Sequence, residues 1–375
     1  MEQKHERIIR MTNLYRSGLG LSIAARALGV LLAFILIGSI QFQEPFTETS
    51  AQQVGPNRLF LPAVFRNVIQ NGPSVFTTSY YMATVDPAEL YRRGCNLGAR
   101  DFGLPGVQDN LVILDFGGPR NLGGGVYGSR LFTTAVWVST GQIAAAVQSF
   151  GLGYYMCTQD DLSSSLVIGI GTNNYTYDGT PLYAVTYEHG VAWALMVNQV
   201  NQYFVEKGYS RQVSAVGAND IELSWNDYTP TKNWLNGYDS VNNYEMINFG
   251  AIPGCPYFKS PGAQCGSYPY IWTKDQVWDV TWGAGPVYPL PEIYANSGVN
   301  AEQWYLMSVY AAQAHGLPME FRGVMTQLQA CQVRPDYGCD VLDNTPLQGW
   351  TQLSTLVNGN PITAHLIRWS TDITW

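Results

Sequence analysis

The stretch Val213-Ser214-Ala215-Val216-Gly217-Ala218-Asn219-Asp220-Ile221-Glu222 runs from an apolar segment directly into two acidic residues. This pattern predicts a short buried strand over residues 213–218 that ends where the acidic residues begin. Side chains two positions apart on an extended chain point to the same side. Asp220 and Glu222 are therefore expected to place two carboxylates on one face at the carboxyl end of this strand.

Short apolar strands alternate with helices along the chain from about residue 73 onward. The other expected strands cover residues 74–82, 111–116, 166–172, 245–252, 287–294, 320–327 and 362–369. The expected helices start at residue 86 or cover residues 139–155, 187–207, 231–241, 273–282, 300–315 and 345–357. Eight such units predict an α/β fold, a (β/α)8 TIM-like barrel over residues 73–375. An open doubly wound sheet is the alternative, less favoured because no glycine-rich phosphate loop follows the first strand.

The first 51 residues have the pattern of an export signal or an N-terminal membrane anchor. Basic residues from Lys4 to Arg26 precede an apolar run, residues 27–40, and Thr49-Ser50-Ala51 offers small residues for cleavage. The run is short for a membrane span, which favours a signal peptide, but anchoring through residues 27–40 stays open. Residues 52–72 are expected to be a linker or entry segment. The bulk of the chain is thus predicted to be extracellular or in the cell envelope.

The composition limits the possible partners of the chain. Charged residues make up only 13% of the 375 residues and the net charge is −8, so nucleic acid is excluded as a partner. The chain also contains 24 Tyr and 11 Trp. These rings either fill a large core or line a cleft in which they stack on sugar faces. The sequence leaves both possibilities open.

The six cysteines form an even set, which in an exported chain indicates disulfide bonds. Cys255 and Cys265 flank one Pro/Gly-rich loop, and Cys331 and Cys339 flank another, so proximity favours these two pairs. Cys95 and Cys157 then remain as the third pair. No Cys-x-x-Cys motif occurs and the four His are scattered, so we expect no metal site and no cofactor.

Polar residues gather where the predicted strands end, which is where the active sites of such barrels lie. Asp115, Asn173, Asn248 and Gln327 come at the ends of four strands, and Glu292 and Tyr294 end another. His189 falls in the first turn of a helix at the same rim, and Trp225 follows the acidic pair. The predicted substrate-binding residues are His189, Asn173, Trp225, Tyr294 and Gln327.

The acidic residues at this rim suit the hydrolysis of a glycosidic bond. That reaction needs one carboxyl group that donates a proton and a second that is ionised. We assign Glu222 as the donor because its side chain is longer, and Asp220 as the group that orients or stabilises. Asp115 and Glu292 are candidates for the second catalytic role. The alternative is purely structural: Asp220 caps the following loop and Glu222 forms a salt bridge.

At Asp220-Ile221-Glu222 the chain resembles the glycoside-hydrolase-like TIM barrels of secreted bacterial proteins. It is distantly similar to the lysozyme family that carries Asp-x-Glu on its fourth strand, and similar to uncharacterised exported barrels. That family also has an Asp at the end of the first strand, where this chain has no acid before Asp86. The resemblance implies a hydrolase acting on polysaccharide or peptidoglycan. The alternative is a non-catalytic barrel that binds glycan or is associated with the envelope.

Overall fold

The computed structural model describes residues 72–73, 75–176, 184–335 and 343–375. The chain divides into two compact units, Met1–Asn57 and Arg58–Trp375, and every described residue lies in the second. The predicted signal or anchor (residues 1–51) and nearly all of the predicted linker (residues 52–72) therefore lie outside the described residues. Among the described residues, no helix combines the length and the hydropathy needed to cross a membrane.

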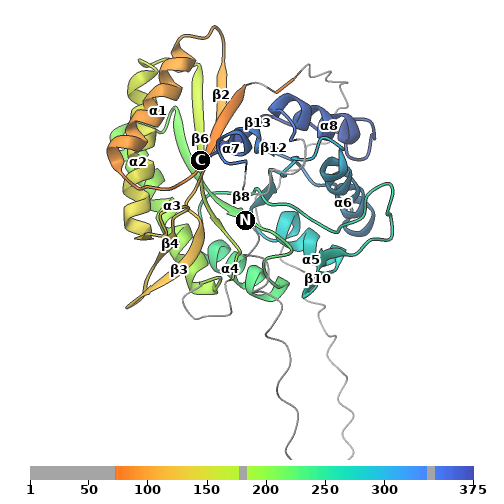
Figure 1. Ribbon diagram of the computed structural model, residues 1–375. Coiled ribbons are helices and arrows are strands. Elements are labelled where there is room, and N and C mark those ends of the chain that lie inside the picture. The colour runs from red at the N-terminus through yellow and green to blue at the C-terminus, as the bar shows by residue number, and fades with distance from the viewer. Residues whose placement is uncertain (1–71, 74, 177–183, 336–342) are drawn as a thin grey trace, which may run out of the picture. The chain divides into compact units, whose positions relative to one another are not determined.

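Eight parallel strands form a nearly closed barrel, consistent with the predicted TIM-like fold (Figure 1). They are β1 (Phe76–Tyr81), β2 (Gln108–Asp115), β6 (Ser164–Asn173), β7 (Val213–Asp220), β8 (Met246–Asn248), β11 (Val287–Pro289), β12 (Gly323–Thr326) and β13 (Trp369–Thr374). Their order is β11-β8-β7-β6-β2-β1-β13-β12. Backbone hydrogen bonds join the two end strands, from Met325 N to Pro291 O and from Ile293 N to Met325 O, both 2.9 Å long. We call this junction between β11 and β12 the seam of the barrel.

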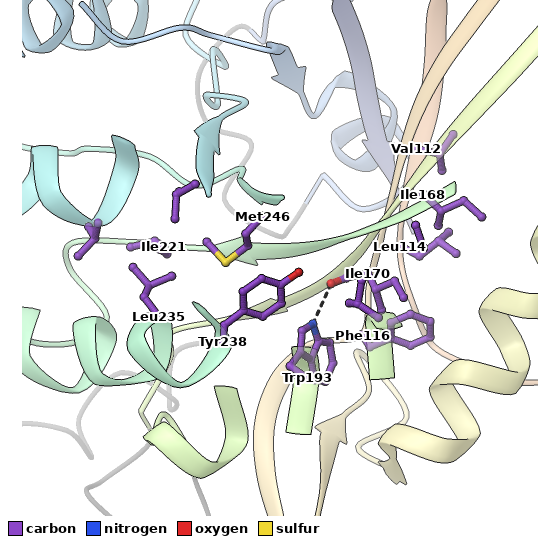
Figure 2. Close-up of a cluster of buried hydrophobic side chains, with 14 of the residues drawn as sticks. Val112, Leu114, Phe116, Ile168, Ile170, Trp193, Ile221, Leu235, Tyr238 and Met246 are labelled. Atoms are coloured by element: carbon purple, nitrogen blue, oxygen red, sulfur yellow. Dashed lines mark hydrogen bonds between the residues drawn. The ribbon is translucent and has the colours of Figure 1, made fainter. Parts of the chain in front are cut away.

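Successive side chains along each strand point alternately into the barrel and out of it, so the structure has two separate hydrophobic cores. On β2, Leu111 and Ile113 belong to a small cluster inside the barrel, together with Val216 and Ala218 of β7. The intervening Val112 and Leu114 point outward into a larger cluster between the strands and the helices (Figure 2). In that outer core Trp193 donates a hydrogen bond from its indole N–H to the Ile170 carbonyl, 2.9 Å away (Figure 2). The same alternation places Asp115 and Asp220 on the inner face, at the carboxyl ends of their strands.

Helices cover the outside of the strands. They are α1 (Pro87–Phe102), α2 (Thr140–Cys157), α3 (Tyr187–Lys207), α4 (Tyr228–Val241), α5 (Lys274–Trp278), the π-helical turn η1 (Asp279–Gly283), α6 (Val299–His315), α7 (Leu328–Val333) and α8 (Pro346–Asn358). The sequence predicts most of their starts because side-chain caps are present. Ser139 and Thr345, for example, each form a reciprocal capping box with a Gln three residues later.

The eighth strand lies later than predicted. The sequence analysis placed it at residues 362–369, whereas β13 covers Trp369–Thr374 and pairs with β1 and β12. A turn at Asn360–Thr363, closed by a hydrogen bond from Thr363 N to Asn360 O (3.0 Å), occupies the start of the predicted segment. Trp369 and Ile373 face inward and belong to the inner core, so the burial of these two side chains fixes the position of β13.

The sixth strand is shorter than predicted, and the fourth is longer. The segment 287–294 is a strand only over β11, because Pro289 and Pro291 have no N–H group to donate. The fourth strand, β7, continues to Asp220, and Ile221 and Glu222 belong to the loop that follows it.

Two small sheets in the loops were not predicted. A three-stranded antiparallel sheet, β3 (Gly118–Gly123), β4 (Val126–Arg130) and β5 (Trp137–Ser139), lies between β2 and α2. A two-stranded hairpin, β9 (Cys265–Ser267) and β10 (Tyr270–Trp272), follows β8. Both insertions come after strand ends and extend the loops on the side where Asp115 and Asp220 lie.

Two of the three predicted disulfide bonds are present. Cys95–Cys157 links α1 to α2, and Cys255–Cys265 closes the loop that precedes β9. Cys339 lies outside the described residues, so the pairing of Cys331 with Cys339 stays a prediction.

Candidate active site

Four predicted acidic residues converge at the carboxyl end of the barrel. Asp220, Glu222 and Glu292 each offer a carboxylate oxygen, and these three oxygens lie within 4.8 Å of one another. Asp115 ends β2 on the same inner face, and its charge acts on both Asp220 and Glu292. β7 ends at Asp220, whereas Glu292 follows β11, so chain segments far apart in sequence build the cluster.

Hydrogen bonds fix the orientation of the two glutamates. The Ala251 backbone N–H donates to Oε1 of Glu222 at 3.1 Å, and the Tyr294 hydroxyl donates to Oε1 of Glu292 at 2.6 Å. The carboxyl oxygens of Glu222 and Glu292 lie within 4.8 Å of each other. At this distance the negative charge of Glu222 raises the pKa of Glu292. Two carboxyl groups this close favour a state in which one is protonated and the other is ionised.

The loop that carries Glu222 is held by a neighbouring amide. Asn174 accepts a hydrogen bond from the Glu222 backbone N–H at 3.0 Å and donates one to the Glu222 carbonyl at 3.1 Å. Asn174 follows β6, the strand paired with β7, so the loop conformation is tied to the barrel itself. This clamp brings Glu222 beside Asp220 although the strand has already ended.

Burial shifts the pKa of every acid in the cluster upward. Burial raises the pKa of Glu222 to about 7, and the neighbouring Glu292 and Ala251 N–H oppose this rise. It raises the pKa of Asp115 to about 7 as well. The pKa values of Asp220 and Glu292 are raised further, first by burial and then by the negative charges around them.

The two glutamates differ in burial. Glu292 is nearly enclosed, at 7% exposed, whereas Glu222 is partly open to solvent, and this difference favours the proton on Glu292. The donor role of Glu222 stays a prediction.

A cavity of about 380 Å³ lies at the same end of the barrel. Its lining includes the predicted residues Asn173 and Trp225, together with Tyr175 and Trp375. Trp225 and Tyr175 meet edge to face, with ring centroids 5.5 Å apart. Asn173 pairs in register with Asp220, so this aromatic-lined cavity begins one strand away from the acids.

One of the predicted substrate-binding residues, His189, lies in the core. It is fully buried, where Nε2 is 2.9 Å from the Gly128 carbonyl and Nδ1 accepts a hydrogen bond from the Trp234 indole at 2.8 Å. With both ring nitrogens engaged, it holds α3, α4 and β4 together and cannot contact a substrate. Gln327 directly follows β12, as predicted, and its side-chain amide donates to Asp343 at 3.4 Å.

Several residues at this end of the barrel were missed in the sequence. Tyr81 ends β1, so the rule that site residues follow strand ends could have found it. Trp375 lines the cavity and contacts the Tyr81 ring at a tilt, with centroids 4.6 Å apart, and only the correct placement of β13 reveals it. Arg120 is 2% exposed and lines the cavity from β3, a strand that no sequence pattern indicated.

Comparison with known proteins shows distant likenesses only. No protein-family model matches the chain, and no curated protein does. Among solved structures, a GH113 β-1,4-mannanase complex matches 82% of this chain and 89% of its own, with 10% identity and a TM-score of 0.38. A mandelate racemase/muconate lactonizing enzyme from Jannaschia sp. CCS1 matches 82% of this chain, with 11% identity and a TM-score of 0.36. This chain spans 56% of that second protein. The function has to be argued from the residues of this chain.

Proposed function

We propose that this chain is a glycoside hydrolase that acts on polysaccharide or cell-wall glycan outside the cytoplasm. The observation that carries the proposal is the close approach of the Glu222 and Glu292 carboxyl oxygens, within 4.8 Å of each other at the carboxyl end of the barrel. Hydrolysis of a glycosidic bond needs one protonated and one ionised carboxyl group, and two carboxyl groups this close favour that division.

The proton arrangement assigns the roles. Glu292 would donate its proton to the leaving oxygen, and the Tyr294 hydroxyl would stabilise the carboxylate that remains. Glu222 would act as the ionised group at the anomeric carbon. Asp220 would orient the reacting groups, and Asp115 lies beside it on the same inner face.

The oxygens of Glu222 and Glu292 lie within 4.8 Å of each other. A sugar would have to enter between them and separate the two carboxyl groups. Trp225, Tyr175 and Asn173 would bind the neighbouring sugar units in the cavity.

The experiment is a reducing-end assay on a panel of polysaccharides that includes peptidoglycan and β-linked glucans and mannans. We expect Glu222→Gln and Glu292→Gln each to lower activity at least about a hundredfold, the usual range for a lost acid or base. Glu206→Gln, an exposed acid on α3, is the matched control and should leave activity unchanged. Activity retained in both site variants would exclude the assignment.

A non-catalytic glycan-binding barrel is the second candidate. It is favoured by the burial of the acids, since three of the four are less than 10% exposed. In that case the chain would bind polysaccharide in affinity electrophoresis without releasing reducing ends. Trp225→Ala would weaken this binding, whereas Glu292→Gln would leave it intact.

The proposed location outside the cytoplasm rests on the N-terminal sequence pattern and on the two disulfide bonds, which persist in oxidising compartments. Cell fractionation with an N-terminal sequence of the mature protein would test it. Recovery of the protein in the cytoplasm with reduced cysteines would contradict it.

A further inference from the structure

We propose that the carboxylates of Asp220, Glu222 and Glu292 form a binding site for a hard divalent cation, with calcium as the best fit. The three side chains each present one oxygen, and these oxygens lie within 4.8 Å of one another. A single ion placed between them could contact all three. The inference concerns binding and does not depend on whether the chain hydrolyses glycans.

A second observation points to a missing ligand at the same place. Oδ1 of Asp220 and Oδ2 of Asp115 are buried and have no hydrogen-bond partner among the described residues. Asp220 is only 4% exposed and Asp115 is fully buried, so water in bulk does not solvate these oxygens. Both side chains lie on the inner face of the barrel, where the cluster is. A buried anionic oxygen without a donor is costly, and a cation would satisfy it.

The ion pairs of the described residues lie away from this cluster. Within the described ranges, the ion pairs of Lys, Arg and His involve Glu89, Asp101, Asp109, Glu245, Asp275 and Asp279. None of these is an acid of the site. The negative charge of the four carboxyl groups at this end of the barrel is therefore compensated by protons or by a bound ion.

The two glutamates are already oriented for ligation. The Ala251 N–H holds Oε1 of Glu222, and the Tyr294 hydroxyl holds Oε1 of Glu292. Each bond fixes its carboxylate through one oxygen and leaves the other oxygen available for ligation. Hydrogen bonds of this kind orient ligands at metal sites and strengthen binding.

The donor set and the spacing select the ion. Oxygen-only ligands suit calcium, magnesium or manganese and not the softer metals that prefer Cys and His. The earlier expectation of no metal rested on Cys and His spacing alone, so it does not bear on such a site. Calcium–oxygen bonds of about 2.3–2.6 Å allow opposite ligands roughly 5 Å apart, whereas magnesium allows only about 4 Å. The spread of up to 4.8 Å therefore favours calcium.

The test uses the full chain after dialysis against a chelator. Terbium replaces calcium at oxygen sites, and its luminescence is sensitised by nearby aromatic rings, which Tyr294 and Tyr81 provide here. We expect aromatic-sensitised luminescence on adding terbium, its displacement by CaCl2 at lower concentrations than by MgCl2, and a calcium-dependent rise of Tm. Asp220→Asn and Glu292→Gln should each weaken binding at least about tenfold.

Asp275→Asn, which changes an exposed acid on α5, is the matched control and should bind as the unmodified chain does. Circular dichroism must show that each variant is folded, and Tyr294→Phe offers a milder change that should also weaken binding. Absence of luminescence and of a Tm shift in the unmodified chain would overturn the proposal. Luminescence that survives unchanged in both acid variants would also overturn it, because the ion would then lie elsewhere on the surface.

Discussion

At the scale of single residues, His189 shows how a buried group sets the pH dependence of stability. Burial lowers its pKa to about 4, helped by the charge of Arg120 and opposed by the Gly128 carbonyl. The folded state thus prefers the neutral ring, so its contribution to stability is complete above the unfolded pKa of about 6.5. That contribution is lost as the pH falls from 6.5 toward 4. At about pH 5 the loss amounts to about 2 kcal/mol.

We therefore expect the free energy of unfolding to fall more steeply with acidification in the unmodified chain than in His189→Gln. Chemical denaturation at about pH 7.5 and at about pH 5 measures the difference, with other titrating groups common to both proteins. His189→Gln should be less stable at neutral pH, because it disturbs the contacts to Trp234 and Gly128. Parallel pH profiles for the two proteins would contradict the prediction, because they would show that the pKa of His189 is the same in the folded and the unfolded chain.

The residues also show what a sequence can and cannot reveal about a site. Asp115, Asp220 and Glu292 could be predicted to meet because parallel strands bring their carboxyl ends to one edge. The burial of His189 could not be predicted. Its partner, the Gly128 carbonyl, comes from β4, which is a strand in an insertion without a recognisable sequence pattern. The contact of Glu222 with Glu292 depends on the loop that Asn174 clamps, which is a tertiary effect.

At the scale of elements, helix pairs are joined by close approaches at glycine. Gly94 of α1 and Gly153 of α2 each face backbone of the other helix, and a Cβ at Gly153 would lie 2.9 Å from the Cys95 nitrogen. Cys95–Cys157 ties the same pair covalently. The helices could be predicted from caps and periodicity, but their close contact follows only from the packed structure.

We expect Gly153→Ala to destabilise the chain by roughly 1–3 kcal/mol or more, the usual cost of overpacking. The new Cβ would meet the backbone of α1, which cannot move aside in the way that the end of a flexible side chain can. Gly141→Ala in the first turn of the same helix is the control, because its nearest neighbour is the Ser139 hydroxyl at 3.8 Å. It should be neutral or stabilising by up to about 1 kcal/mol. Equal Tm values for the two variants would contradict the close contact.

At the scale of the whole barrel, closure is uneven. β2 and β6 pair over eight residues, from Gln108 to Asp115 on the β2 side. At the seam, the hydrogen bonds come from Arg322, Ile293 and Met325, because Pro289 and Pro291 have no N–H to contribute. The eight-stranded barrel could be predicted from the repeated strand–helix pattern. The position of the seam depends on strand order and on how β11 ends.

We expect amides at the seam, those of Ile293 and Met325, to exchange with deuterium at least about tenfold faster than the buried amides of β2, because local opening breaks fewer bonds there. Hydrogen exchange with mass spectrometry on peptides from each strand measures this.

Glu292 lies at the seam, whereas Asp220 and Glu222 belong to β7 and its loop, so an ion shared by the three would tie the seam to the firmly paired strands. Calcium should then slow exchange at the seam in the unmodified chain and leave it unchanged in Glu292→Gln. Seam amides as slow as those of β2 without calcium would show that the prolines do not weaken the closure.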